Sequence, residues 1–228
     1  MCGRFTLRSP ARDVAKAFGV ALADDWQPRY NIAPTQAVFA VRRLAAESGR
    51  QAAMLHWGLI PAWADDPAIG NRLINARAET LATKPAFRRA FRQRRCLIPC
   101  DGFYEWQKQG RAKQPYFITA EQGGLFALAG LWEHWERNGL TIESCTVITT
   151  EANSLVAALH DRMPVILPPA AHDQWLDPME QDPARLEPLL RPFPTESMRL
   201  QAVSPLVNNP RNDTPKCLEP AGQRMFDW

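Results

Sequence analysis

The chain has 228 residues, 46% of them hydrophobic, and a formal net charge of +3. This apolar content is typical of a globular protein, and the longest apolar run, residues 125–132, is too short to cross a bilayer. The charge is uneven, because residues 1–115 hold 19 basic and 9 acidic residues, whereas residues 116–228 hold 8 and 15. The net charges of +10 and −7 favour an anionic partner facing the first half of the chain.

The five cysteines fit a reducing compartment. The number of cysteines is odd, and no CxxC pair or Cys/His cluster has the spacing of zinc ligands, so we expect neither a metal nor another cofactor. Charged residues near the start argue against a signal peptide, and we therefore expect a cytoplasmic protein without a membrane partner. The cysteines are Cys2, Cys96, Cys100, Cys145 and Cys217.

In chain order, the predicted elements are short. Ser9-Pro10 predicts an N-cap followed by the first residue of an amphipathic helix, and residues 30–35 predict a loop. Further short helices are predicted after residue 75, from 85, and at 154–159, 170–176 and 183–190. Strands are predicted at 37–43, 52–57, 96–99, 102–108, 115–120, 125–135, 140–150 and 198–203. Their spacing predicts one α+β domain over residues 1–228 with antiparallel strands.

The first five residues, Met1-Cys2-Gly3-Arg4-Phe5, carry the most specific chemistry. Removal of Met1 would leave Cys2 with an α-amine of pKa about 7.7–8.0 beside a thiol of pKa about 8.5. These two nucleophiles suit an aldehyde, because the amine forms an imine and the thiol closes it to a thiazolidine. Gly3 permits close approach of a ligand, and we expect Arg4 to lower the pKa of the thiol.

Three other positions are candidates for acid–base or orienting roles. Glu105 lies among aromatic residues in Phe103-Tyr104-Glu105-Trp106, which predicts a raised pKa, although a solvated strand face is an equal alternative. His160 is a candidate proton shuttle or a helix-terminal histidine that satisfies a carbonyl. Asn75 is a candidate for holding a hydroxyl or carbonyl, or a helix cap.

Arginines and tryptophans supply candidate contacts to a phosphate-bearing ligand. Arg77 and Arg162 are phosphate candidates or plain ion-pair partners, and the segment 57–63 contains two tryptophans in a predicted loop. A further arginine cluster, residues 88–95, is expected on a short solvated helix.

In combination and order, eight motifs resemble the SOS-response-associated peptidase family, the abasic-site processing proteins. The resemblance extends from residue 2 to about residue 209. The motifs are Met1-Cys2-Gly3-Arg4-Phe5, Asn31-Ile32-Ala33-Pro34-Thr35, Trp57-Gly58-Leu59-Ile60-Pro61, Asn75-Ala76-Arg77-Ala78-Glu79-Thr80, Arg95-Cys96-Leu97-Ile98-Pro99, Gly102-Phe103-Tyr104-Glu105-Trp106, Thr146-Val147-Ile148-Thr149-Thr150 and His160-Asp161-Arg162-Met163-Pro164.

The resemblance implies antiparallel strands curled into a barrel-like core with short flanking helices. It implies binding to single-stranded DNA and a protective thiazolidine crosslink between mature Cys2 and the ring-opened aldehyde of an abasic site. Asn75, Glu105 and His160 are the implied catalytic partners. The implied DNA-binding residues are Arg4, Asn31, Trp63, Arg77, Trp106, Thr149 and Arg162.

Several alternatives remain at this point. Met1 is removed by an aminopeptidase or by the protein itself, through cysteine-peptidase-like chemistry, whereas the crosslinking is expected to use lyase-type Schiff-base chemistry. A monomer is expected, associated with the nucleoid when DNA is damaged, with replication-fork proteins as candidate further partners. The rival functions are an N-terminal-nucleophile amidohydrolase, a general cysteine protease built on Cys2 and His160, and a passive single-strand binder.

Overall fold

The computed structural model describes residues 2–22, 26–110 and 112–221. Its strands are β1 (Phe5–Leu7), β2 (Arg29–Ile32), β3 (Ala37–Arg42), β4 (Gln51–Trp57), β5 (Asn75–Arg77), β6 (Arg95–Cys100), β7 (Gly102–Gln109), β8 (Ala112–Ala120), β9 (Phe126–Arg137), β10 (Leu140–Glu151), β11 (Arg162–Pro164) and β12 (Met198–Ala202). Its α-helices are α1 (Ala11–Phe18), α2 (Arg88–Gln93), α3 (Ser154–Ala157), α4 (His172–Leu176) and α5 (Pro183–Leu186). Short 3-10 turns connect them, among them Pro67–Arg72 and Ala78–Thr80.

A closed ring of strands forms the barrel-like core. The antiparallel pairs β4–β3, β3–β6, β6–β9 and β9–β10 follow one another, and β10 returns to β4 in a parallel pairing. The predicted α+β fold with a barrel-like core is confirmed, and the parallel pairing adds to the antiparallel pattern expected. Periodicity could not reveal it, because the pairing joins distant segments.

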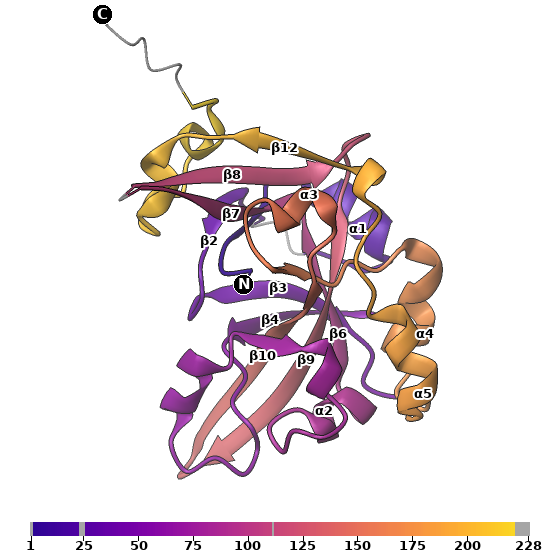
Figure 1. The fold of residues 1–228 in the computed structure, drawn as a ribbon. Coiled ribbons are helices and arrows are strands. Elements are labelled where there is room, and N and C mark those ends of the chain that lie inside the picture. Colours follow the sequence, from indigo (N-terminus) through magenta and orange to yellow (C-terminus); the bar gives the residue numbers. More distant parts are fainter. Residues whose placement is uncertain (1, 23–25, 111, 222–228) are drawn as a thin grey trace, which may run out of the picture.

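A second sheet lies against this barrel, with the strand order β12-β8-β7-β1-β2 (Figure 1). The start of the described chain lies between the two sheets, and residues of both contribute to the main hydrophobic core. Strand β10 also pairs with β5 in parallel and with β11 in antiparallel register. These pairings place β5, which carries Asn75 and Arg77, and β11, which carries Arg162, beside β10.

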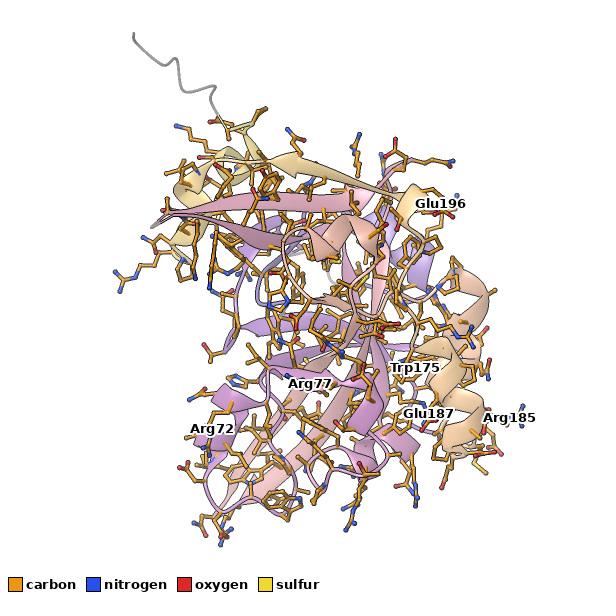
Figure 2. All side chains as sticks on the ribbon, in the orientation of Figure 1. Arg72, Arg77, Trp175, Arg185, Glu187 and Glu196 are labelled. Carbon is orange, nitrogen blue, oxygen red and sulfur yellow. The ribbon has the colours of Figure 1, made fainter. Side chains whose placement is uncertain are left out.

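The arginine cluster contributes one structural residue. Arg95 is 2% exposed, and its guanidinium donates to backbone carbonyls of α2, of Trp175 in α4 and of the segment after α4. Trp175 in turn donates from its indole to the carbonyl of Cys96, 2.9 Å away, so α4 is attached to β6. Figure 2 shows Trp175 at the side of the barrel that α4 covers.

Two local predictions were wrong, and one strand was missed. Pro10, not Ser9, is the N-cap of α1, because the Ser9 hydroxyl instead donates to the carboxylate of Asp101. The expected loop at 30–35 begins as strand β2, which pairs with the unpredicted strand β1. β1 has only three residues, too few for a periodic pattern. By contrast, Asn153 caps α3 as expected, accepting from the amide of Val156 at 3.0 Å.

Among the described residues, no helix has both the length and the apolar character that a membrane span requires.

Candidate active site

Cys2 lies at the entrance to β1 and is 0% exposed. The side-chain amide of Asn75 donates to the Cys2 carbonyl over 2.9 Å, and β5 holds Asn75 there through its parallel pairing with β10. The other amide atom, Asn75 Oδ1, is buried without a hydrogen-bond partner among the described residues. One end of this side chain therefore fixes Cys2, and the other end retains an unused acceptor.

The expectation that Arg4 lowers the pKa of the Cys2 thiol was wrong. Burial, together with the nearby Glu105 carboxylate, raises the pKa of the Cys2 thiol to about 12. Arg4 opposes this through its backbone N–H, whereas its guanidinium turns away to Asn31 and to the carbonyl of Val207. Desolvation thus outweighs the positive charge that sequence proximity suggested.

Glu105 lies on β7 and is 4% exposed, so the solvated-face alternative is excluded. Burial raises the pKa of its carboxyl group to about 7, opposed in part by a hydrogen bond from the Trp106 backbone. The predicted upward shift of the pKa is therefore confirmed in direction. A carboxyl group of this pKa is divided between its acid and base forms near neutral pH, as reversible proton transfer requires.

His160 follows α3 and is neither a simple helix cap nor fully buried, since its side chain is 33% exposed. Its Nδ1 lies 2.9 Å from the backbone N–H of Arg162 and 2.8 Å from a carboxylate oxygen of Asp161. The N–H contact requires a neutral ring with its proton on Nε2, whereas the carboxylate contact favours a protonated Nδ1. Burial lowers the pKa of His160, and Asp161 opposes this shift.

A cleft of about 1200 Å³ connects these groups. Glu105 and His160 both line it. Cys2 interacts electrostatically with Glu105 and accepts the hydrogen bond from Asn75. The remaining lining residues of the cleft are Arg4, Trp106, Gln107, Lys108, Lys113, Ala158, Leu159, Asp161 and Asn208. The four predicted catalytic residues thus come from the segment before β1, from β5 and β7, and from the loop after α3, and the fold brings them near one another.

Arg4 and Trp106 form one rim of the cleft. The Arg4 guanidinium lies 5.7 Å from the Trp106 ring centre, a cation–π distance, and the Trp106 indole donates to Asn208 over 2.7 Å. Asn31, predicted to contact DNA, is 0% exposed. It accepts from Arg4, and its amide donates to carbonyls of the segment 207–212, so it positions Arg4 and the Asn208 segment.

Arg77, Thr149 and Arg162 are brought together by β10. Thr149 pairs with Arg77 of β5 and with Pro164 of β11. The Arg162 guanidinium donates to both carboxylate oxygens of Glu79, at 2.7 and 2.9 Å, and to the Thr149 carbonyl at 2.6 Å. Arg77 is exposed and lies at the front of the barrel in Figure 2. The Thr149 hydroxyl is buried and has no partner among the described residues.

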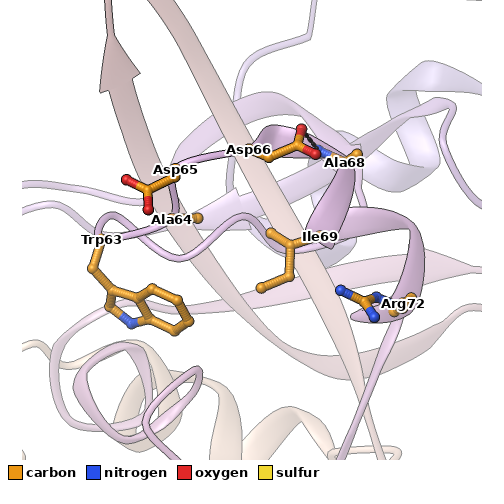
Figure 3. Close-up of a pocket in the computed structure, with 7 residues that line it drawn as sticks. All are labelled: Trp63, Ala64, Asp65, Asp66, Ala68, Ile69 and Arg72. Atoms are coloured by element: carbon orange, nitrogen blue, oxygen red, sulfur yellow. Dashed lines mark hydrogen bonds between the residues drawn. The ribbon is translucent and has the colours of Figure 1, made fainter.

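Trp63 does not line the cleft. Trp63 is 60% exposed, and it borders a separate cavity of about 370 Å³ with Ile69 and Arg72 (Figure 3). Figure 3 shows the indole and the Arg72 guanidinium on either side of Ile69, with Asp65 and Asp66 along the upper edge. The sequence brought Trp63 into the same prediction as Trp106, but the fold separates the two.

Three lining residues were missed in the sequence analysis. Lys108, Lys113 and Asn208 carried no motif signal, because their position depends on the register of β7 with β8 and on the path of the segment after β12. Among the described residues, no group of three or more histidine, cysteine or acidic side chains could hold a metal ion.

Comparison with known proteins decides the family. The sequence model of the family described as SOS response associated peptidase matches residues 1–210. The chain belongs to this family. It is 44% identical over 227 residues to the abasic site processing protein YoaM of Bacillus subtilis (strain 168), covering 96% of this chain and 98% of that one.

Two other members of this comparison are more distant. The abasic site processing protein HMCES of Xenopus tropicalis is 33% identical over 249 residues, covering 90% of this chain and 74% of HMCES. A crystal structure of a protein from Bacteroides thetaiotaomicron superimposes with a TM-score of 0.86 at 27% identity, covering 97% of this chain and 100% of that one. This solved structure therefore shares the fold of this chain.

Proposed function

We propose that this protein processes abasic sites in single-stranded DNA by forming a thiazolidine crosslink between mature Cys2 and the ring-opened sugar aldehyde. The observation that carries the proposal is that Glu105 and His160 line one cleft, while Cys2 interacts electrostatically with Glu105 and accepts a hydrogen bond from Asn75. The names of YoaM and HMCES as abasic site processing proteins support the choice of substrate.

The reaction begins with removal of Met1, which frees the Cys2 amine. The amine adds to the aldehyde carbon, and loss of water gives an imine. The thiol sulfur then bonds to the imine carbon while its proton passes to nitrogen, so that the closed ring differs from the reactants by one water. Each of these steps moves a proton, and none needs an oxidant or a metal.

Glu105 suits these proton transfers. Its neutral form can donate a proton to the departing hydroxyl of the first adduct, and its ionised form can then accept the thiol proton. Because burial raises the pKa of the Cys2 thiol, the thiol needs such a base to react. Asn75 holds the Cys2 carbonyl, and its free Oδ1 is available to accept from the mature amine or the opened sugar.

His160 lines the cleft and acts on the sugar of the abasic site. With Nδ1 accepting the Arg162 backbone N–H, its Nε2 carries the proton and can donate to the ring oxygen as the sugar opens. Arg4, Arg77 and Arg162 contact phosphates around the lesion, and Trp106 stacks on a neighbouring base. Trp63 extends the stacking surface outside the cleft. Asn31 and Thr149 act through the arginines that they hold.

Self-removal of Met1 is part of the proposal, with the Cys2, Glu105 and His160 groups in the acid–base roles. A general cysteine protease is less well supported, because burial and the Glu105 carboxylate both raise the pKa of the thiol. Proteases of that kind instead depend on a lowered thiol pKa.

The test uses purified protein whose intact mass shows loss of Met1. It is mixed with a single strand containing one abasic site and then denatured. The proposal expects a DNA–protein band that resists denaturation and is absent with an intact strand. A Cys2→Ala variant should bind the same strand without forming the band; a band of wild-type strength from this variant would refute the proposal.

A further inference from the structure

The hairpin of β7 and β8 carries two lysines that face each other. The register pairs Lys108 with Lys113, close to the turn that joins the strands. Neighbouring strands do not reach this far, since β1 pairs with β7 at Gly102 and Phe103 only, and β12 pairs with β8 from Tyr116 onward. The end of the hairpin is therefore a two-stranded ribbon that extends beyond the sheet, as Figure 1 shows for β7 and β8.

Both lysines also line the cleft that contains Glu105 and His160. Both are exposed, and neither forms an ion pair with a carboxylate of the described residues. The cleft is thus lined on the hairpin by two ammonium groups and on the loop after α3 by the segment 158–161.

Like charges directly opposite each other destabilise an antiparallel pair of strands. One reason to keep such a pair is protection of open strand edges against aggregation, for which lysine is common. That reason does not account for their position beside the acid–base groups. An anion bound between the two ammonium groups would attract both of them and so offset their mutual repulsion.

We infer that Lys108 and Lys113 bind the phosphate backbone of the DNA strand on one side of the lesion. This inference rests on the proposed function for the identity of the anion. The lysines lie on β7 and β8, whereas Arg77 and Arg162 lie on β5 and β11, so the two pairs contact different parts of the strand. The hairpin then fixes the direction in which the strand crosses the cleft.

The test is the salt dependence of crosslinking at limiting DNA. The variant Lys108→Ala/Lys113→Ala loses two cationic contacts, so the slope of log rate against log salt should become shallower by about 1.4, at about 0.7 per phosphate of a single strand. Between 50 and 200 mM salt this amounts to about a sevenfold smaller loss of rate than in wild type.

Two matched variants sharpen this result. Lys16→Ala/Lys84→Ala removes the same charge from α1 and from the segment before α2, and it should keep the wild-type slope. Lys108→Arg/Lys113→Arg should restore it. An unchanged slope in the alanine variant, or an equal change in the Lys16 and Lys84 control, would contradict the inference and leave edge protection as the reason for the pair.

The two proposals can fail separately. If wild-type protein forms no crosslink, the proposed function is wrong, and fluorescence anisotropy with an undamaged single strand still measures the lysine contribution to the salt slope. If wild type forms the crosslink but the hairpin variant keeps its slope, only the inference about the lysines is wrong.

Discussion

The cleft beside Cys2 and the surface around Trp63 both combine tryptophan with arginine, but their ionisable groups differ. The cleft contains Glu105, which is 4% exposed and whose pKa burial raises to about 7. The Trp63 surface carries Asp65 and Asp66 at its solvent edge, where Asp65 pairs with Arg137 and Asp66 caps a short turn. Aromatic and cationic groups suffice for binding, whereas covalent chemistry also needs a buried group that exchanges protons near neutral pH.

This comparison predicts the largest effect at Cys2. Cys2→Ala should abolish the denaturation-resistant crosslink, because no other residue supplies both the amine-bearing carbon and the thiol. Binding to an undamaged strand should stay within about twofold, since Cys2 is buried and contacts no phosphate. A band assay and anisotropy on the same sample measure both. Cys217→Ala, in a separate small core, is the matched thiol control and should crosslink normally.

Glu105→Gln should have the next largest effect. The amide keeps the shape of the side chain but cannot exchange a proton, so crosslinking at saturating DNA should slow by about 10²–10⁴-fold. In wild type, the step that needs the neutral acid should weaken as pH rises through about 7, and this limb of the pH–rate profile should be missing in the variant. A profile that kept the limb would assign it to another group.

The same substitution makes a prediction about stability. Burial raises the pKa of Glu105 from 4.5 to about 7, so the folded state favours the neutral form. The associated stability is fully present below pH 4.5 and is lost as pH rises to about 7. Above pH 7, Glu105→Gln should therefore have a larger free energy of unfolding than wild type, by on the order of 3 kcal/mol, and unfold at a higher temperature; below pH 4.5 the two should match. Thermal unfolding at pH 4 and pH 8 tests this.

Asp161→Asn should have a smaller effect, because Asp161 acts through His160. Its carboxylate opposes the lowering of the His160 pKa, so the variant should titrate His160 at lower pH, with less than about a tenfold change in crosslinking rate. A histidine NMR titration gives the direction directly. A His160 pKa that rose in the variant would contradict the geometry at Nδ1.

Trp63→Ala tests the other side of the comparison and should have the smallest effect. Loss of one stacking surface costs about 1–3 kcal/mol of binding free energy when a base is fully stacked. Because Trp63 lies outside the cleft, we expect a loss of affinity at the low end of this range. The crosslinking rate at saturating DNA should be unchanged. Trp106→Ala, within the cleft, is the matched control and should change that rate as well.

Sequence reasoning singled out the proposed reactive residues because their types are unusual in their positions. An N-terminal cysteine and a glutamate among aromatic residues are recognisable without a fold. The burial of Cys2 was missed, since Arg4 suggested a lowered thiol pKa and only the packed structure shows that its guanidinium is committed to Asn31. The lysine pair was missed because the strand predicted from residue 115 begins at Ala112.

The barrel was predicted from a resemblance and not from strand spacing. Alternation along a strand predicts which face is buried, but it does not specify the partner strand. The return of β10 to β4, and its pairing with β5, join segments about 70–90 residues apart in the chain. These pairings bring Asn75 to Cys2 and Arg77 to Arg162, so the assembly of the cleft depended on the least predictable contacts of the fold.

The most direct measurement is the mass of the adduct between the mature protein and an abasic single strand, followed by peptide mapping. The account predicts a mass equal to the two reactants less one water, located on an N-terminal peptide that begins with Cys2 and has neither a free thiol nor a free amine. An adduct on a lysine, or a thiol that still reacts with an alkylating reagent, would contradict it.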